Sequence, residues 1–112
     1  MAENDNWVAL LKLSTVEMDE VEAVEVNGLK LAVFHLEDGS VHVTRNVCTH
    51  EFALLSEGWF EGCEIECPLH AGRFDVRTGE ALCSPLKENL KTYAAKVEDG
   101  VVFAKLPIEA RL

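Results

Sequence analysis

The sequence predicts an all-β protein built from small antiparallel sheets. Three turn dipeptides carry this prediction: Asn-Gly at residues 27–28, and Asp-Gly at residues 38–39 and 99–100. Such dipeptides favour the tight type I′ turn of a β-hairpin, because both central residues must adopt positive φ angles. In residues 41–44 polar and apolar side chains alternate, as in a strand with one buried face. Short strands at this spacing indicate a small antiparallel barrel or sandwich.

A short helix and two hairpins are expected in the N-terminal part. Ser14 and Glu17 have the spacing of a capping box, in which each side chain satisfies a backbone amide at the start of a helix. The residues that follow are rich in valine, so at most one or two helical turns are predicted. The first hairpin is expected to pair residues 24–26 with residues 29–34, and the second leads into a strand at residues 41–44.

Two further turns and one hairpin are expected in the C-terminal part. Glu-Gly at residues 61–62 and Thr-Gly at residues 78–79 are typical of turns. A third hairpin is expected to pair residues 93–97 with residues 101–106. With 112 residues and no linker in the sequence, the chain is expected to form a single domain over residues 1–112.

The composition is that of a globular protein, with 48% hydrophobic and 27% charged residues. No apolar run is long enough to cross a bilayer. The sequence starts without the basic and apolar segments of a secretory signal, so a cytoplasmic location is expected. The net charge of −10 disfavours nucleic acids and anionic membranes as partners, since both are polyanions. It favours partners with basic surfaces.

Two short pairs of metal-binding residues stand out in the middle of the chain. Cys48 and His50 form the first pair, Cys67 and His70 form the second, and sixteen residues separate His50 from Cys67. Thiolates are preferred ligands of iron–sulfur clusters. A [2Fe–2S] cluster in which two histidines replace two cysteines on one iron requires this ligand set. These four residues are the candidate metal and cofactor ligands, and the chain is expected to hold one cluster.

Zinc is the alternative metal. Two cysteines and two histidines also satisfy tetrahedral Zn²⁺. Zinc sites more often take both thiolates from one Cys-x₂-Cys pair, whereas here each pair supplies one thiolate and one imidazole. This distribution and the Cys-Pro-x-His sequence at residues 67–70 favour the iron–sulfur cluster.

The acidic residues are unevenly distributed, with five of them between Glu17 and Glu25 and another five near the candidate ligands. Five glutamates lie between the two ligand pairs, with no lysine or arginine among them: Glu51, Glu57, Glu61, Glu64 and Glu66. A solvated acidic surface accounts for most of them. The functional interpretation is that some of them form a docking face that attracts basic partners.

Several other residues have ordinary structural interpretations. Cys63 and Cys83 are simplest as small buried residues, and a disulfide between them is disfavoured in a reducing compartment. His42 lies at a polar position of an alternating strand and is expected at the surface. Trp59 is either a packing residue or part of a docking surface. Arg73 is expected to pair with a nearby acid, and the alternative is a lone cation near the site of electron transfer.

Residues 48–75 resemble the Rieske family, and in particular the soluble Rieske-type ferredoxins of bacterial aromatic-ring-hydroxylating dioxygenase systems. The motifs that carry the resemblance are Cys-Thr-His and Cys-Pro-Leu-His-Ala-Gly-Arg-Phe-Asp. Residues 78–85 and 89–93 are similar to the ferredoxins of naphthalene-type dioxygenases, so the resemblance covers nearly the whole chain. It implies the Rieske fold, with small antiparallel sheets and a cluster-binding part of two loops at about residues 45–86.

The resemblance also implies a division of the ligands between the two irons. Cys48 and Cys67 would bind one iron, and His50 and His70 would bind the other iron, which lies near solvent in this family. Pro85 would lie on a third loop that covers the cluster.

Two departures from the respiratory branch of the family concern the potential of the cluster. Ala53 and Leu69 stand where respiratory proteins have the cysteines of a disulfide between the two loops. Gly72 and Phe74 stand where those proteins have hydroxyl groups that donate hydrogen bonds to the cluster. Because fewer donors stabilise the reduced cluster less, we predict a potential near the bottom of the Rieske range, about −150 mV.

The resemblance implies an electron-transfer protein and not an enzyme. Such a ferredoxin takes single electrons from a flavoprotein ferredoxin reductase and passes them to the terminal Rieske oxygenase of an aromatic-ring dioxygenase, in aromatic hydrocarbon catabolism. The sequence contains no dinucleotide fingerprint, so the electrons are expected to come from another protein. A monomer is expected. The alternative is a Rieske-like small subunit of a larger reductase, such as nitrite reductase.

Overall fold

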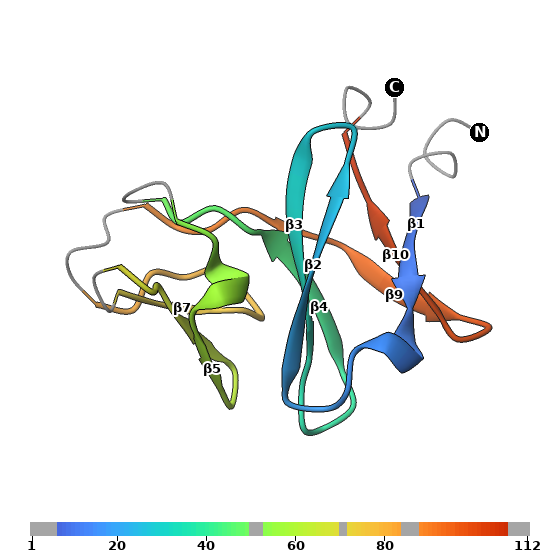
Figure 1. The fold of residues 1–112 in the computed structure, drawn as a ribbon, viewed down its shortest axis with the longest axis horizontal. Helices are drawn as coiled ribbons and strands as arrows, with labels where there is room; N and C mark the ends of the chain where they lie inside the picture. Colours follow the sequence, from blue (N-terminus) through green and yellow to red (C-terminus); the bar gives the residue numbers. More distant parts are fainter. Residues whose placement is uncertain (1–6, 50–52, 70–71, 84–87, 108–112) are drawn as a thin grey trace.

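The computed structural model describes residues 7–49, 53–69, 72–83 and 88–107. The described strands form three antiparallel sheets (Figure 1). In the order of their hydrogen-bonded neighbours, the sheets are β1 (Trp7–Lys12), β10 (Val101–Lys105) and β9 (Ala95–Glu98); β2 (Glu20–Val26), β3 (Leu29–His35), β4 (Val41–Arg45) and β8 (Thr92–Tyr93); and β5 (Trp59–Glu61), β6 (Glu64–Glu66) and β7 (Arg73–Asp75). Two short 3₁₀ helices are η2 (Leu13–Thr15) and η3 (Leu55–Glu57). The predicted all-β fold class is confirmed.

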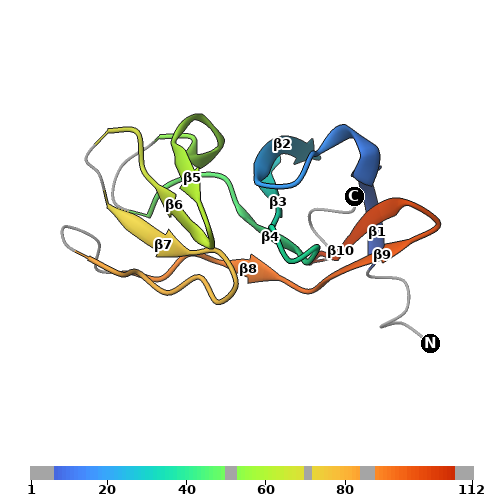
Figure 2. The same ribbon diagram turned by 90° about the horizontal axis from the view of Figure 1, so that it is seen from below.

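Two regions lie side by side along the longest axis of the molecule (Figures 1 and 2). We call β1–β4 and β8–β10 the base, and we call η3, β5–β7 and the loops joined to them the tip. Each region has its own buried core, and β3 contributes to both. Leu31 and Val33 lie in the core of the base, whereas Ala32 and Phe34 lie in the core of the tip. One strand serves both cores because successive side chains face opposite sides of a sheet.

The first and third predicted hairpins form with the predicted turn. Asn27 and Gly28 between β2 and β3 have φ angles of 48° and 87°. Asp99 and Gly100 between β9 and β10 have φ angles of 52° and 77°. Two consecutive residues with positive φ are the signature of the type I′ turn. Turns also form where predicted around residues 61–62 and 78–79.

The second hairpin forms with a different turn. Only Gly39 has a positive φ, of 89°, and its amide donates to the carbonyl of Leu36 over 2.9 Å. The Asp38 carboxylate instead accepts a hydrogen bond from the backbone amide of Ser40 over 2.9 Å. This local bond offers aspartate a second turn geometry. The prediction of a type I′ turn at residues 38–39 was therefore wrong, although the hairpin was right.

The N-terminal helix is short, as predicted, but the capping box is wrong. The 3₁₀ helix spans Leu13–Thr15, and its first flanking residue is Lys12 instead of Ser14. Val16, which follows the helix, is extended and buried in the base. Burial of this valine ends the helix before Glu17 could act as part of a cap.

The last predicted hairpin is divided between two sheets. Tyr93 belongs to β8, which pairs with β4, whereas Ala95–Glu98 forms β9 and pairs with β10. The expected strand at residues 93–97 is thus two strands, with a break that passes the chain from one sheet of the base to the other. Among the described residues, no helix is both long enough and apolar enough to cross a membrane.

Candidate metal centre

The two predicted cysteine ligands lie in the core of the tip. Cys48 is 4% exposed and Cys67 is 1% exposed, although they belong to different loops. Both belong to the buried cluster that also contains Ile65 and Phe74. The fold therefore brings two distant thiols into one apolar environment. The other two predicted ligands, the histidines at positions 50 and 70, lie outside the described residues.

Each predicted ligand loop is closed by a backbone hydrogen bond. The amide of Cys48 donates to the carbonyl of Ala53 over 3.0 Å, and the amide of Cys67 donates to the carbonyl of Gly72 over 2.7 Å. Each closed loop contains the sequence position of one predicted histidine. Two loops with the same kind of closure thus each contain one buried cysteine and the sequence position of one predicted histidine ligand.

A buried asparagine fixes the start of the first ligand loop. The Asn46 side-chain amide donates to the Ser56 hydroxyl over 2.9 Å, and its carbonyl oxygen accepts from the Ser56 backbone amide over 2.7 Å. The backbone of Asn46 also bonds to Lys30 of β3 and to Leu55 of η3. Asn46 therefore ties the base to the tip two residues before Cys48. No pattern in the sequence singled it out, because its partners are distant in the chain.

The segment that follows the third predicted loop is hydrogen-bonded to the first ligand loop. The Thr49 hydroxyl donates to the carbonyl of Glu88 over 3.0 Å. The Asn89 side-chain oxygen accepts a hydrogen bond from the amide of Ala81 over 3.0 Å. Pro85, predicted to cover the cluster, lies outside the described residues. The described residues on both sides of it are therefore held close to Cys48 and to β7.

An arginine neutralises part of the acidic surface beside the second ligand loop. Arg73 contacts Glu64 and Glu66 with nitrogen–oxygen distances of 3.1 Å each. Hydrogen bonds to these two carboxylates raise the pKa of Arg73, so the cation is firmly held. The prediction that Arg73 pairs with a nearby acid is confirmed. Glu51, the first of the five glutamates between the ligand pairs, lies outside the described residues.

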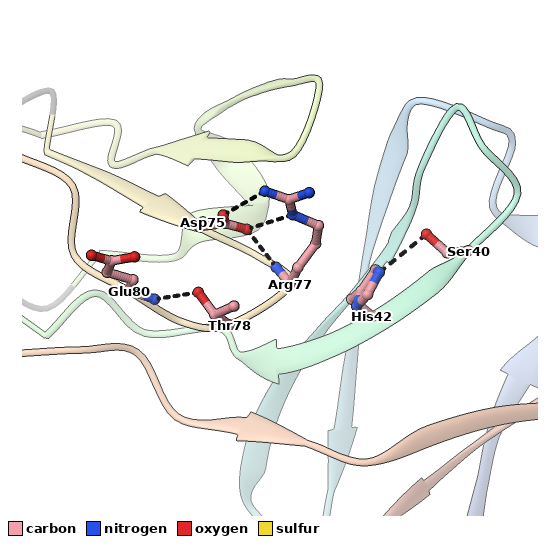
Figure 3. Close-up of polar contacts among 6 residues, drawn as sticks. All are labelled: Ser40, His42, Asp75, Arg77, Thr78 and Glu80. Carbon is pink, nitrogen blue, oxygen red and sulfur yellow. Dashed lines mark hydrogen bonds and ion pairs between the residues drawn. The ribbon is translucent and has the colours of Figure 1, made fainter.

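Charged groups also meet where the tip faces the base (Figure 3). In the tip, Arg77 contacts the Asp75 carboxylate over 2.9 Å, and this contact lowers the pKa of Asp75. In the base, the His42 ring lies 3.1 Å from the Ser40 hydroxyl. His42 is half-buried, where we expected a surface residue, and its burial lowers its pKa. The pKa of His42 also responds to the charges of Asp38 in its own hairpin and of Arg77 and Asp75 in the tip.

The remaining two cysteines differ from each other in burial. Cys63 is a free thiol and is half-buried in the turn between β5 and β6. Cys83 is exposed, so the prediction that it is a small buried residue was wrong. The residue follows the isolated bridge between Phe74 and Ala81, where the chain leaves the sheet of the tip. Because Cys63 is free, the disulfide between these two cysteines is not formed.

The described donor atoms fit an iron–sulfur cluster. Within residues 7–49, 53–69, 72–83 and 88–107, no three histidine, cysteine or acidic side chains gather as a metal site. The two histidine positions that the sequence predicts as ligands lie outside these residues. Two thiols buried among apolar side chains are soft ligands in a site shielded from water, which suits iron–sulfur chemistry.

Comparison with known proteins agrees with this chemistry. The family of Rieske [2Fe-2S] domains matches residues 6–94. The ferredoxin component of the naphthalene 1,2-dioxygenase/salicylate 5-hydroxylase systems of a Ralstonia species is 46% identical over 101 residues, which cover 90% of this chain and 96% of the relative.

Two solved structures have closely similar folds. A ferredoxin of Sphingomonas yanoikuyae B1 has a TM-score of 0.85 and 40% identity, over 91% of this chain and 100% of that chain. A chain in the complex of reduced oxygenase and oxidised ferredoxin of carbazole 1,9a-dioxygenase has a TM-score of 0.83 and 33% identity, over 89% of this chain and 93% of that chain. With these matches the iron–sulfur interpretation prevails over zinc: the chain belongs to the Rieske [2Fe–2S] family, and its cofactor is a [2Fe–2S] cluster.

Proposed function

We propose that this protein is a ferredoxin that carries single electrons from a flavoprotein ferredoxin reductase to the terminal Rieske oxygenase of an aromatic-ring dioxygenase system. The observation that carries this proposal is the match with the Ralstonia ferredoxin component, which extends over 90% of this chain and 96% of the relative. A chain similar to this one over 89% of its length occurs in a solved complex of an oxygenase and a ferredoxin. The protein would act in the breakdown of aromatic hydrocarbons.

We assign the cluster ligands to Cys48, His50, Cys67 and His70, with both thiolates on one iron and both imidazoles on the other. The burial of the two cysteines and the backbone closure of the two loops support this assignment. When bound, the cluster accepts and releases one electron. The buried side chains of the tip exclude water from the thiolates, and the closed loops hold the ligands in a fixed geometry.

An electron carrier needs a route to its cofactor and a surface for brief contacts with partners. The second ligand loop suits this role, since Pro68 and Leu69 are exposed directly after buried Cys67. In this proposal the chain has no catalytic residue. Oxygen activation and ring hydroxylation belong to the oxygenase.

We further propose a monomeric, cytoplasmic protein with one domain over residues 1–112 and a cluster-binding part at about residues 45–86. The sharing of β3 between the two cores supports one domain, because neither core is complete without it. The free thiol of Cys63 suits a reducing compartment. The small subunit of a nitrite reductase also has this fold, with a TM-score of 0.75, but at 23% identity the likeness extends to the fold alone.

Purified protein tests the proposal in two stages. We expect about two irons and two sulfides per chain, no stoichiometric zinc, an EPR signal on reduction and a potential of about −150 mV. The protein is then added to the reductase and the oxygenase of a naphthalene dioxygenase. In this mixture, oxidation of NADH should lead to formation of the oxygenase product. A colourless zinc protein would contradict the cofactor assignment. An iron–sulfur protein that elutes only with a larger reductase would favour the subunit alternative.

A further inference from the structure

The outer face of the tip sheet carries a row of three side chains beside the second ligand loop. The register of the sheet pairs Trp59 with Glu66, and Glu66 with Arg73. Directly paired residues of neighbouring strands lie on the same face of a sheet. The loop with Cys67 leaves the sheet next to this row, since Glu66 precedes Cys67 in the chain. The row therefore lies at the end of the sheet nearest a proposed cluster ligand.

A surface depression of about 430 Å³ lies between this row and the loop. Its lining includes Glu57, Trp59, Glu66, Cys67 and Leu69. Trp59 is 74% exposed and Leu69 is 60% exposed, so two large apolar side chains are in water at its edge. Exposed apolar groups with polar neighbours are typical of sites where another protein binds.

The charge around the depression is negative. Arg73 offers one positive charge to two carboxylates, those of Glu64 and Glu66. Glu57 and Glu61 are exposed near the same strands. A partner group that fits must therefore be cationic and must also tolerate contact with an indole. Arginine meets both conditions, because its planar cation stacks on aromatic rings and donates paired hydrogen bonds to carboxylates.

We propose that this depression binds an arginine side chain from a basic surface of the terminal oxygenase. The inference rests on the proposed function, which supplies the partner. We choose the oxygenase because the similar chain in the carbazole dioxygenase structure occurs in a complex with an oxygenase. Since Cys67 lines the depression, an arginine bound there would lie close to the cluster. Docking at this place would therefore bring the oxygenase close to the cluster, so that the electron has a short distance to cross between the two proteins.

Substitutions at the depression test the proposal in a turnover assay with reductase and oxygenase components of a naphthalene dioxygenase. Trp59→Ala should raise the ferredoxin concentration for half-maximal turnover about tenfold, because it removes the stacking surface. Trp59→Phe should recover part of this loss. Glu57→Gln should raise the same concentration about threefold at low ionic strength, and this effect should vanish in high salt. The half-maximal concentration is the measured quantity in all three variants.

Matched controls come from the base. Met18→Ala removes an apolar side chain that is 56% exposed, and Glu22→Gln removes an exposed carboxylate of β2. Neither should change the half-maximal concentration. The absorption spectrum and the potential of each variant report whether the cluster is intact. If Trp59→Ala loses its cluster, Glu57→Gln and Trp59→Phe decide the question.

Three results would overturn the proposal. One is an active wild-type ferredoxin whose Trp59 and Glu57 variants behave as wild type. Another is a loss that Met18→Ala or Glu22→Gln shows equally. The third is an effect confined to reduction of the ferredoxin by the reductase, measured separately by stopped flow. Failure of the proposed function is distinguishable, because wild-type protein itself would then support no oxygenase turnover.

Discussion

The base and the tip are stabilised in different ways. In the base, β2 and β3 have seven residues each and pair along their whole length across a two-residue turn. In the tip, each strand of the sheet has only three residues. Sheets of such short strands are marginal without packing partners. Local strand pairing therefore stabilises the base, whereas the tip depends on the structures to which it is attached.

An aromatic contact and a buried asparagine are two of the attachments that join the tip to the base in the part of the chain that the structure describes. Phe34 of β3 lies edge-to-face with Phe60 of β5, with ring centroids 5.1 Å apart. Asn46 bonds to the base through Lys30 and to the tip through Ser56. In the proposed function the cluster also stabilises the tip, because its ligands come from two loops of the tip. Removal of each attachment should therefore affect the tip more than the base.

The largest effect is expected when the cluster is lost. Cys67→Ser should abolish the visible absorbance, because the variant lacks one of the two proposed thiolate ligands. Metal binding is coupled to folding where ligands join separate loops. Backbone amides of β6 and β7 should then exchange on the order of a hundredfold faster, while those of β2 and β3 change much less. Hydrogen exchange resolved by segment measures both.

Cys63→Ser is the matched control for this prediction. Cys63 is a free, half-buried thiol of the same region and is not a proposed ligand. The variant should keep its cluster and its exchange pattern. Equal acceleration of exchange in the base and the tip of Cys67→Ser would show that the two regions are one cooperative unit.

The next largest effect concerns the core of the tip. Phe74 is fully buried, and Phe74→Ala should lower the free energy of unfolding by about 3–5 kcal/mol. Leu31→Ala, which opens a cavity in the core of the base, should cost about 2–5 kcal/mol. Only Phe74→Ala should accelerate loss of the cluster in dilute denaturant, where global unfolding is rare. Visible absorbance reports this rate. Similar rates in both variants would show that the cores of the tip and the base do not open independently.

A smaller effect is expected where Asn46 joins the two regions. Asn46→Ala leaves the half-buried amide of Ser56 without its acceptor, which should cost about 1–3 kcal/mol. Asn89→Ala, at an exposed asparagine with one bond to Ala81, should cost less, about 0.5–1.5 kcal/mol. Denaturant unfolding of both variants gives the comparison. If Asn89→Ala lowers the free energy of unfolding more than Asn46→Ala does, the hydrogen bond beside the third loop holds the tip more strongly than Asn46 does.

The sequence alone predicted best the turns that a dipeptide determines by itself. Asn27 and Gly28 determine a turn by their own conformational preferences, and the strands beside them pair locally. Predictions failed where a distant contact decides the local geometry. Ser14 does not cap a helix, because burial of Val16 in the base ends the helix early. Asp38 failed for a local reason, because a hydrogen bond from the Ser40 amide to its carboxylate competes with the type I′ turn.

The same distinction holds for the candidate site. The spacing of Cys48 and Cys67 indicated a metal site, and the structure buries both in one core. The five glutamates between the ligand pairs are without a basic neighbour in the sequence, yet Arg73 lies against two of them. This pairing follows from the register of β6 and β7, which no local pattern predicts. Asn46 escaped prediction for the same reason.

The smallest effect is expected at the boundary between the two regions, where His42 of the base faces the tip. Burial lowers the pKa of His42 below its usual value of about 6.5; Arg77 lowers it further, and Asp38 and Asp75 oppose the change. The unfolded chain therefore takes up a proton at a higher pH than the folded protein does. Stability from the neutral ring is fully present above pH about 6.5 and declines as the pH falls toward the lower, folded-state pKa.

His42→Gln should remove this decline and leave stability above neutral pH nearly unchanged. Ser40→Ala is the control, since it removes the hydroxyl beside the ring but keeps the imidazole. Chemical denaturation of wild type and both variants between about pH 5 and 8 gives the comparison, and subtraction of the two curves cancels groups common to both proteins. If His42→Gln shows the same pH dependence as wild type, the histidine does not couple the two regions. The decline would then originate in other titrating groups.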